Sequence, residues 1–246
     1  MCIAFAVLMI IAYMVFNDYQ VQQEIDKKLL ISKQKEIINE TDDILLNVTQ
    51  VPYSSKLVII LQTRILSALK QILTATPNAI QIKQRIEGIT EQIKNSQATP
   101  PTEPSFTPPK DTAMALKMLK VLRRLRKIIR IEFNRGRMSQ IDLVREDKCL
   151  EIMIFKIQFS NLLRNIDECE LTKQFGTMQQ LIASGLNSLH KLNIQDAWLE
   201  SVQEHLTTKL DELNREISAK HLQEAQQERA KEEDDIDMLF QPKKKW

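Results

Sequence analysis

Few residues of this chain have the types and the spacing that catalysis or metal binding requires. His190, His205 and His221 lie far apart, and none has a cysteine or an acidic residue at metal-ligand spacing. The three cysteines are also widely spaced, so they predict neither a zinc site nor a disulfide framework. The four glycines are isolated, which excludes a glycine-rich phosphate loop, and no serine sits in a nucleophile turn. We therefore expect no enzyme activity, no metal and no cofactor.

Basic residues gather on one predicted helix, residues 113–135. At 100° per residue, its apolar side chains fall within an arc of roughly 140°, and the basic side chains occupy the other side. From Lys110 to Arg137 the chain has ten basic and two acidic residues, a local charge of +8. The predicted basic face consists of Lys117, Lys120, Arg123, Arg124, Arg126, Lys127 and Arg130.

Three interpretations of this basic face are open. In the first, the apolar arc belongs to a protein core and the basic residues are only solvated. In the second, the helix lies in an anionic lipid surface and its apolar side chains enter the acyl region. These side chains would be Met118, Leu122, Leu125 and Ile129. In the third, the face binds nucleic acid, but no aromatic residues alternate with the basic ones, so this partner is the least favoured.

A segment near the C-terminus, residues 234–240, places apolar residues inside an acidic run. Apolar residues in a charged segment beyond any predicted core reduce solubility, which favours a role in binding. We expect a short acidic-hydrophobic peptide that folds onto the groove of a protein partner. The alternative is a frayed terminus whose Phe240 packs back on the bundle. The predicted partner-binding residues are Asp234, Asp235, Ile236, Asp237, Met238, Leu239 and Phe240.

This segment resembles the response-regulator-binding segments of bacterial chemotaxis proteins. The tail of the CheZ phosphatases and the N-terminal segment of the flagellar switch protein FliM are acidic stretches around an Asp-Ile/Val-Asp-x-Leu-type core. Residues 234–240 (DDIDMLF) have a similar pattern, although the match covers only this part of the 246-residue chain. The resemblance implies binding to a response regulator or a polar hub.

A second resemblance to the CheZ-like phosphatases concerns catalysis. Those enzymes use an acidic residue and a glutamine four positions apart on a helix, within Asp-Leu-Thr-Gly-Gln. Here Glu170 and Gln174 have that spacing, but glutamate replaces aspartate and Lys173 replaces glycine. The resemblance implies that the amide orients a water molecule for phosphoryl hydrolysis. Because acid and amide pairs at this spacing are ordinary neighbours on a helix surface, an enzyme is still not favoured.

The uncharged residues 1–16 (MCIAFAVLMIIAYMVF) predict a transmembrane anchor. A helix of this length rises about 24 Å, which is short for a bilayer core of about 30 Å. The apolar run begins at the first residue, without the basic region or cleavage site of a signal peptide. We therefore expect that Met1 is an internal methionine of a longer chain. The alternative is a buried apolar helix of a soluble bundle.

The charges that follow this anchor predict its orientation. Lys27, Lys28, Lys33 and Lys35 form the first basic cluster, and nothing basic precedes it. The positive-inside rule then places residues 17–246 in the cytoplasm. The absence of a disulfide pattern agrees with a reducing compartment. We expect a single-pass protein of a bacterial inner membrane.

The composition predicts an all-α fold. Four glycines among 246 residues are too few for the turns of a sheet protein, and five of the eight prolines lie in residues 96–112. Isoleucines at positions 82, 86, 89 and 93 form a coiled-coil-like seam for a partner helix, so a homo-oligomer through such helices is a further expectation. The net charge of +2 indicates no bulk attraction to nucleic acid.

These observations divide the chain into an anchor, two cytoplasmic helical bundles and a tail. The predicted segments are the anchor (1–16), a membrane-proximal helical domain (17–95), a proline-rich linker (96–112), a helical bundle that begins with the basic helix (113–222) and a charged tail (223–246). We expect a membrane-anchored scaffold or adaptor that acts through protein–protein interaction. The alternatives are a chemotaxis or motility accessory protein and a membrane-tethered nucleic-acid-associated protein.

Overall fold

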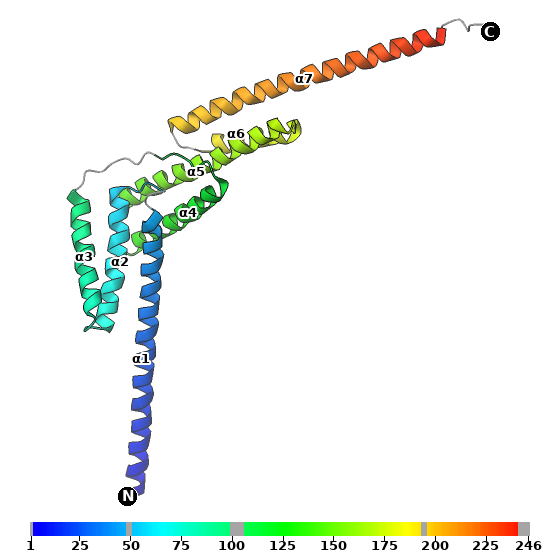
Figure 1. Ribbon diagram of the computed structural model, residues 1–246. Helices are drawn as coiled ribbons and strands as arrows, with labels where there is room; N and C mark the ends of the chain where they lie inside the picture. The colour runs from blue at the N-terminus through cyan, green and yellow to red at the C-terminus, as the bar shows by residue number, and fades with distance from the viewer. Residues whose placement is uncertain (1, 48–50, 99–105, 193–195, 241–246) are drawn as a thin grey trace. The chain divides into compact units, whose positions relative to one another are not determined.

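All the regular secondary structure in the described parts of the chain is helical, which confirms the all-α prediction (Figure 1). The computed structural model describes the backbone of residues 2–47, 51–98, 106–192 and 196–240, and within these ranges all side chains except those of residues 2–12, 98 and 227–240. Its helices are α1 (Cys2–Leu46), α2 (Ser55–Ala75), α3 (Ile80–Ala98), α4 (Thr112–Asn134), α5 (Gln140–Leu171), α6 (Phe175–His190) and α7 (Ala197–Phe240).

The helices form two compact units, Met1–Ile154 and Phe155–Trp246. The division lies inside α5, whereas the sequence analysis placed the boundary at the linker of residues 96–112. The difference arises because α4 and the first half of α5 share the unit of α1 to α3. The basic helix therefore belongs to the same unit as the predicted membrane anchor.

In the first unit, α1, α2 and α3 pack around a shared aliphatic core. This core contains Ile38 of α1, Ile65, Ala68, Leu69 and Ile72 of α2, and Ile89 of α3, each at most 8% exposed. The isoleucine seam of α3 also faces it, since Ile82, Ile86 and Ile93 pack against the same cluster. The seam therefore finds a partner helix within its own unit, mainly α2, and does not need a second copy for this.

Only the second half of α1 takes part in this core. Every residue from 13 to 30 is exposed, and burial begins with Ile31, Ile37 and Ile38. At 1.5 Å per residue the exposed segment extends about 27 Å. We call residues 13–30 the stalk; Figure 1 shows this part of α1 beyond the ends of α2 and α3.

The start of α2 is joined to the first half of α5 by a partly buried hydrogen bond. Ser54 caps α2, because its Oγ accepts from the backbone N–H of Leu57 at 3.0 Å. The same hydroxyl donates to Glu146 at 2.7 Å, and Glu146 is only 2% exposed. Lys56 also pairs with Asp142 one turn before Glu146. Ser54 therefore both caps the N-terminus of α2 and joins that helix to α5.

In the second unit, the end of α5 packs with α6 and α7 through aliphatic side chains. The buried cluster contains Phe159, Ile166, Met178, Ile182, Leu189, Leu199, Val202, Leu206 and Leu213. Gly185 of α6 permits a close approach, because a Cβ there would lie 2.6 Å from Leu162 Cδ2 and 3.2 Å from Leu206 Cδ1. The glycine is therefore required by packing and not by a turn.

We predict that Gly185→Ala destabilises the second unit. Alanine improves helix propensity by about 1 kcal/mol, but two leucine side chains must move to admit the methyl group. We expect a net loss of about 1–3 kcal/mol in the free energy of unfolding, measured by chemical denaturation. The matched control is Gly88→Ala in α3, where a Cβ would meet nothing within 4 Å. A Gly185→Ala protein as stable as Gly88→Ala would contradict the close packing.

Candidate functional site

The predicted recognition segment lies at the end of α7. The helix continues to Phe240, so the backbone of residues 234–240 is helical. The side chains of Asp234, Asp235, Ile236, Asp237, Met238, Leu239 and Phe240 lie outside the described residues. Their role in binding a partner therefore remains a prediction from the sequence.

The structure does not place Glu170 and Gln174 on one helix. α5 ends at Leu171 and α6 begins at Phe175, with Lys173 between them at a φ of 55°. This left-handed residue closes a Schellman-type turn, in which the N–H of Lys173 donates to Glu170 O and the N–H of Gln174 donates to Cys169 O. The phosphatase resemblance requires the acid and the amide to share one helix face. In this structure they do not, because a turn separates them.

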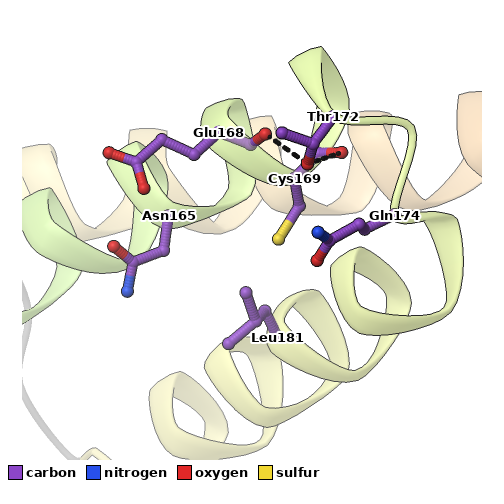
Figure 2. Close-up of a pocket in the computed structure, with 6 residues that line it drawn as sticks. All are labelled: Asn165, Glu168, Cys169, Thr172, Gln174 and Leu181. Atoms are coloured by element: carbon purple, nitrogen blue, oxygen red, sulfur yellow. Dashed lines mark hydrogen bonds between the residues drawn. The ribbon is translucent and has the colours of Figure 1, made fainter.

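Gln174 lines an open polar cleft, whereas Glu170 does not (Figure 2). The cleft has a volume of about 450 Å³ and lies between the end of α5 and α6. Its lining residues are Asn165, Glu168, Cys169, Thr172, Gln174 and Leu181. The carboxylate of Glu170 instead pairs with Lys209 of α7. Glu170 thus has a structural partner, and the two residues form no phosphatase-like site.

The histidines also form no cluster that could hold a metal ion within the described part of the chain. His190 contacts the carbonyl oxygen of Leu186 on its own helix, and His221 lies 3.7 Å from Glu224 on α7. Within the described part of the chain, no group of three or more histidine, cysteine or acidic residues is placed to hold a metal ion.

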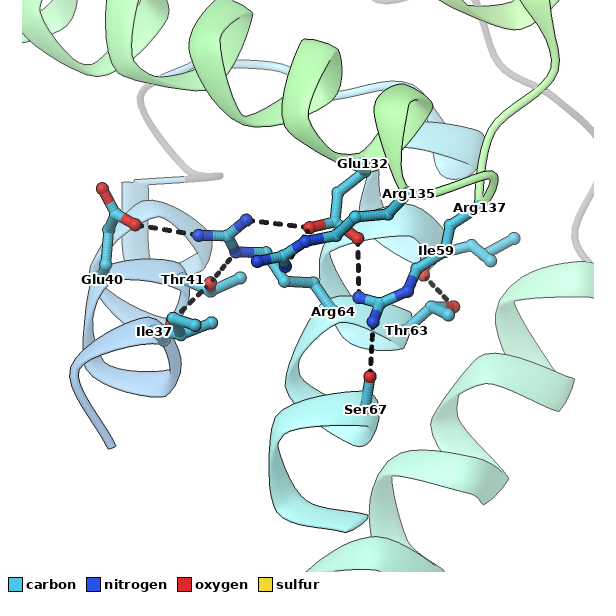
Figure 3. A network of polar contacts seen from close by, with 10 residues as sticks. All are labelled: Ile37, Glu40, Thr41, Ile59, Thr63, Arg64, Ser67, Glu132, Arg135 and Arg137. Carbon is cyan, nitrogen blue, oxygen red and sulfur yellow. Dashed lines mark hydrogen bonds and ion pairs between the residues drawn. The ribbon is translucent and has the colours of Figure 1, made fainter. Parts of the chain in front are cut away.

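The most connected polar site is a buried charge network between α1, α2 and α4 (Figure 3). Its centre is Glu132 of α4, which is 0% exposed. Arg64 of α2, 4% exposed, donates to Glu132 at 2.8 Å and to Glu40 of α1 at 3.0 Å. The Nε of Arg64 also donates to Thr41 Oγ1 at 3.1 Å. One guanidinium group thereby joins three helices.

Two further arginines reach Glu132 from the turn that follows α4. Arg135 donates to Oε1 at 3.1 Å, and Arg137 donates to Oε2 at 2.8 Å and to Ser67 Oγ at 2.6 Å. Gly136, at a φ of 71°, makes this return possible because a left-handed residue reverses the chain there. Both oxygens of the buried carboxylate are therefore satisfied by charged donors.

The sequence analysis did not single out Arg64 or Glu132, although each is a charged residue on the apolar face of its helix. Arg64 lies on the same face of α2 as the buried Leu61, Ile65 and Ala68. Glu132 follows Leu125, Ile128 and Ile129 at helical spacing and so falls on the apolar arc of α4. A charged residue in phase with an apolar stripe indicates a buried ion pair, because a lone buried charge is not stable.

The basic helix predicted over residues 113–135 is α4, and its apolar side is part of a core. Met118, Leu122, Leu125 and Ile129 are at most 4% exposed. In this fold they are therefore core residues and are not exposed for contact with acyl chains.

Three of the seven predicted basic-face residues are occupied by carboxylates. Arg126 binds Asp147 through Nε at 2.6 Å and Nη2 at 2.8 Å. Arg130 also reaches Asp147, at 3.3 Å, and Arg124 lies 3.5 Å from Glu40. The hydrogen bonds from Arg126, opposed by burial, hold the pKa of Asp147 below its ordinary value. Lys117, Lys120, Arg123 and Lys127 are exposed and form no ion pair with any residue that the structure describes.

Comparison with known proteins identifies no relative of this chain: no protein-family model, no curated protein and no solved structure matches it. Functional inference therefore depends on the geometry and the sequence patterns alone.

We predict that Glu132→Gln strongly destabilises the first unit. The substitution removes the charge that compensates the buried Arg64 and leaves donors without acceptors. The expected loss is about 3–5 kcal/mol in the free energy of unfolding, measured by urea denaturation. Arg124→Gln is the matched control, since Arg124 is 56% exposed and its pair with Glu40 should contribute about 0–1 kcal/mol. Equal effects of the two substitutions would show that the buried network is not a major source of stability.

We predict that the ion pair of Arg126 and Asp147 contributes to the loss of folding stability at acidic pH. The folded-state pKa of Asp147 lies below its unfolded value, so its contribution is complete above the ordinary aspartate pKa and is lost as the pH falls through the folded-state value. The free energy of unfolding of the wild type should fall below about pH 4, and less steeply in Asp147→Asn. Asp211→Asn, at an exposed position of α7, should leave the slope unchanged. An unaltered slope in Asp147→Asn would refute the prediction.

Proposed function

We propose that this protein is a membrane-anchored helical scaffold that presents its bundle in the cytoplasm and acts by binding other proteins. The observation that carries the proposal is the continuity of α1. One uninterrupted helix, Cys2–Leu46, contains the apolar residues 2–16 at one end and the core residue Ile38 near the other. Such a helix connects an anchor to the bundle without a flexible joint.

Exposed apolar side chains at the start of the stalk support the anchor. Tyr13, Met14, Val15 and Phe16 are 59–71% exposed, so no described part of the chain covers them. Four consecutive apolar residues in water are unfavourable, and a bilayer is an environment that stabilises them. They also continue the apolar run of the preceding residues on the same helix.

α2 is the competing candidate for a membrane segment. Within the described residues it is the one helix long and apolar enough to cross a bilayer. Half of its apolar stretch is buried, and it carries Arg64 into the charge network. This burial accounts for its apolar character as a core helix, so we assign the anchor to residues 1–16.

The orientation follows from the charges of the stalk. Lys27 and Lys28 lie within it, Lys33 and Lys35 follow directly, and all four are exposed. The positive-inside rule then places both units in the cytoplasm of a bacterial cell. The acidic segment of residues 234–240 is our proposed partner-binding element, on the strength of its resemblance to response-regulator-binding peptides.

We predict that Leu8→Arg combined with Ile11→Arg releases the protein from the membrane. Each arginine at the centre of a spanning helix opposes insertion by about 2.5–3.5 kcal/mol. The variant should move from carbonate-washed membranes to the soluble fraction of the bacterial host. The matched control, Val21→Arg combined with Ile25→Arg, places the same charges on the stalk and should remain in the membrane. If the first variant also stays in washed membranes, another segment such as α2 holds the protein there.

A further inference from the structure

Four basic residues of α4 are exposed and pair with no carboxylate in the described part of the chain. Lys117, Lys120, Arg123 and Lys127 succeed each other at spacings of three, three and four residues, so they follow one side of the helix. We call these four residues the basic strip. From Lys117 to Lys127 the helix rises about 15 Å, which gives one positive charge about every 5 Å.

Carboxylates of α1 and α5 pair with the arginines that lie next to the basic strip. On the side of α1, Arg124 pairs with Glu40; on the side of α5, Arg126 and Arg130 pair with Asp147. The positive charge that remains is therefore confined to a surface one helix wide. A narrow anion fits this pattern better than a broad one, which would meet the carboxylates at both edges.

An exposed leucine lies beside the basic strip. Leu116 is 55% exposed and precedes Lys120 by one helical turn. An apolar side chain among ammonium and guanidinium groups offers a contact that a purely ionic ligand would not use. A peptide can supply both an apolar side chain and carboxylates.

The length of α1 separates the basic strip from the anchoring bilayer, an argument that rests on the proposed function. Arg124 pairs with Glu40, and Glu40 follows Phe16 by 24 positions in the same helix. Along the helix axis this distance is about 36 Å, far beyond a Debye length of about 8 Å at physiological ionic strength. The lipid headgroups around the anchor therefore do not attract these residues.

Nucleic acid is also disfavoured by the residues present. Single strands bind to surfaces that combine positive charge with aromatic side chains on which bases stack. The exposed side of α4 that carries the basic strip has Leu116 and basic residues but no aromatic side chain. A duplex would need a wider field of positive charge than the strip provides between its acidic edges.

We propose that the basic strip is a docking surface for an acidic peptide segment of a partner protein, one that carries carboxylates at about one-turn spacing and an apolar residue beside them. The charges are complementary, the strip has the width of one extended or helical segment, and Leu116 supplies the apolar contact. The proposal assigns a partner chemistry to the scaffold at a site separate from the tail of residues 234–240.

The test measures binding of a fluorescein-labelled ten-residue peptide, nine glutamates with one leucine among them, to the full-length protein in neutral detergent at low salt. The strip variant carries Lys117→Gln, Lys120→Gln, Arg123→Gln and Lys127→Gln. The matched control carries Lys27→Gln, Lys28→Gln, Lys33→Gln and Lys35→Gln, which removes the same charge from another exposed surface of the same unit. Circular dichroism and thermal unfolding establish that both variants are folded.

We expect the strip variant to bind the peptide at least tenfold more weakly than the wild type, and the control to stay within twofold. Equal losses in the two variants would overturn the proposal, because binding would then follow net charge alone. The same assay is repeated with a 20-base-pair duplex and with vesicles of one-third phosphatidylglycerol, and their affinities are compared with that of the peptide. Tighter binding of either than of the peptide, lost in the strip variant, would assign the surface to nucleic acid or lipid instead. Because detergent replaces the bilayer in this assay, a failure of peptide binding does not depend on whether residues 1–16 anchor the protein in a membrane.

Discussion

Glu132 has no exposed surface, and its charge is tolerated only because three guanidinium groups donate to it. This requirement determines the arrangement of the first unit. Arg64 brings α2 to the carboxylate and binds Glu40 of α1 at the same time, so the charges are satisfied only when α1, α2 and α4 meet at this group. Aliphatic packing alone would tolerate other arrangements, because apolar contacts are not directional.

The functional surfaces depend on this arrangement. Once α4 is held against α1 and α2, its apolar arc is buried and its basic side faces solvent. The same contacts bring Glu40 to Arg124 and Asp147 to Arg126, next to the four basic residues that pair with no described carboxylate. The first half of α1 extends beyond this arrangement, since only the residues from Ile31 onward find core partners.

Local patterns in the sequence predicted the elements well and their pairing poorly. The amphipathic period gave the basic helix within one residue of α4, and the isoleucine seam of α3 was correctly read as a face for another helix. The spacing of Glu170 and Gln174 was misleading, because it assumed a continuous helix where Lys173 adopts a left-handed conformation. The linker prolines suggested a domain boundary, but a linker in sequence does not prevent the helices on its two sides from packing together. Arg64 and Glu132 were visible as charges on apolar faces, yet nothing local pairs residues 68 positions apart.

The sequence by itself determined that the chain is helical, where one face of each helix is apolar, and that an uncharged run precedes a long amphipathic helix. These are properties of short segments, set by propensity and by periodicity. Only the tertiary structure decided which charges are buried together, which basic residues remain without a carboxylate, and how far the basic helix lies from the apolar start of α1. Those outcomes depend on contacts between distant segments, and the buried carboxylate of Glu132 is stable in one arrangement of them.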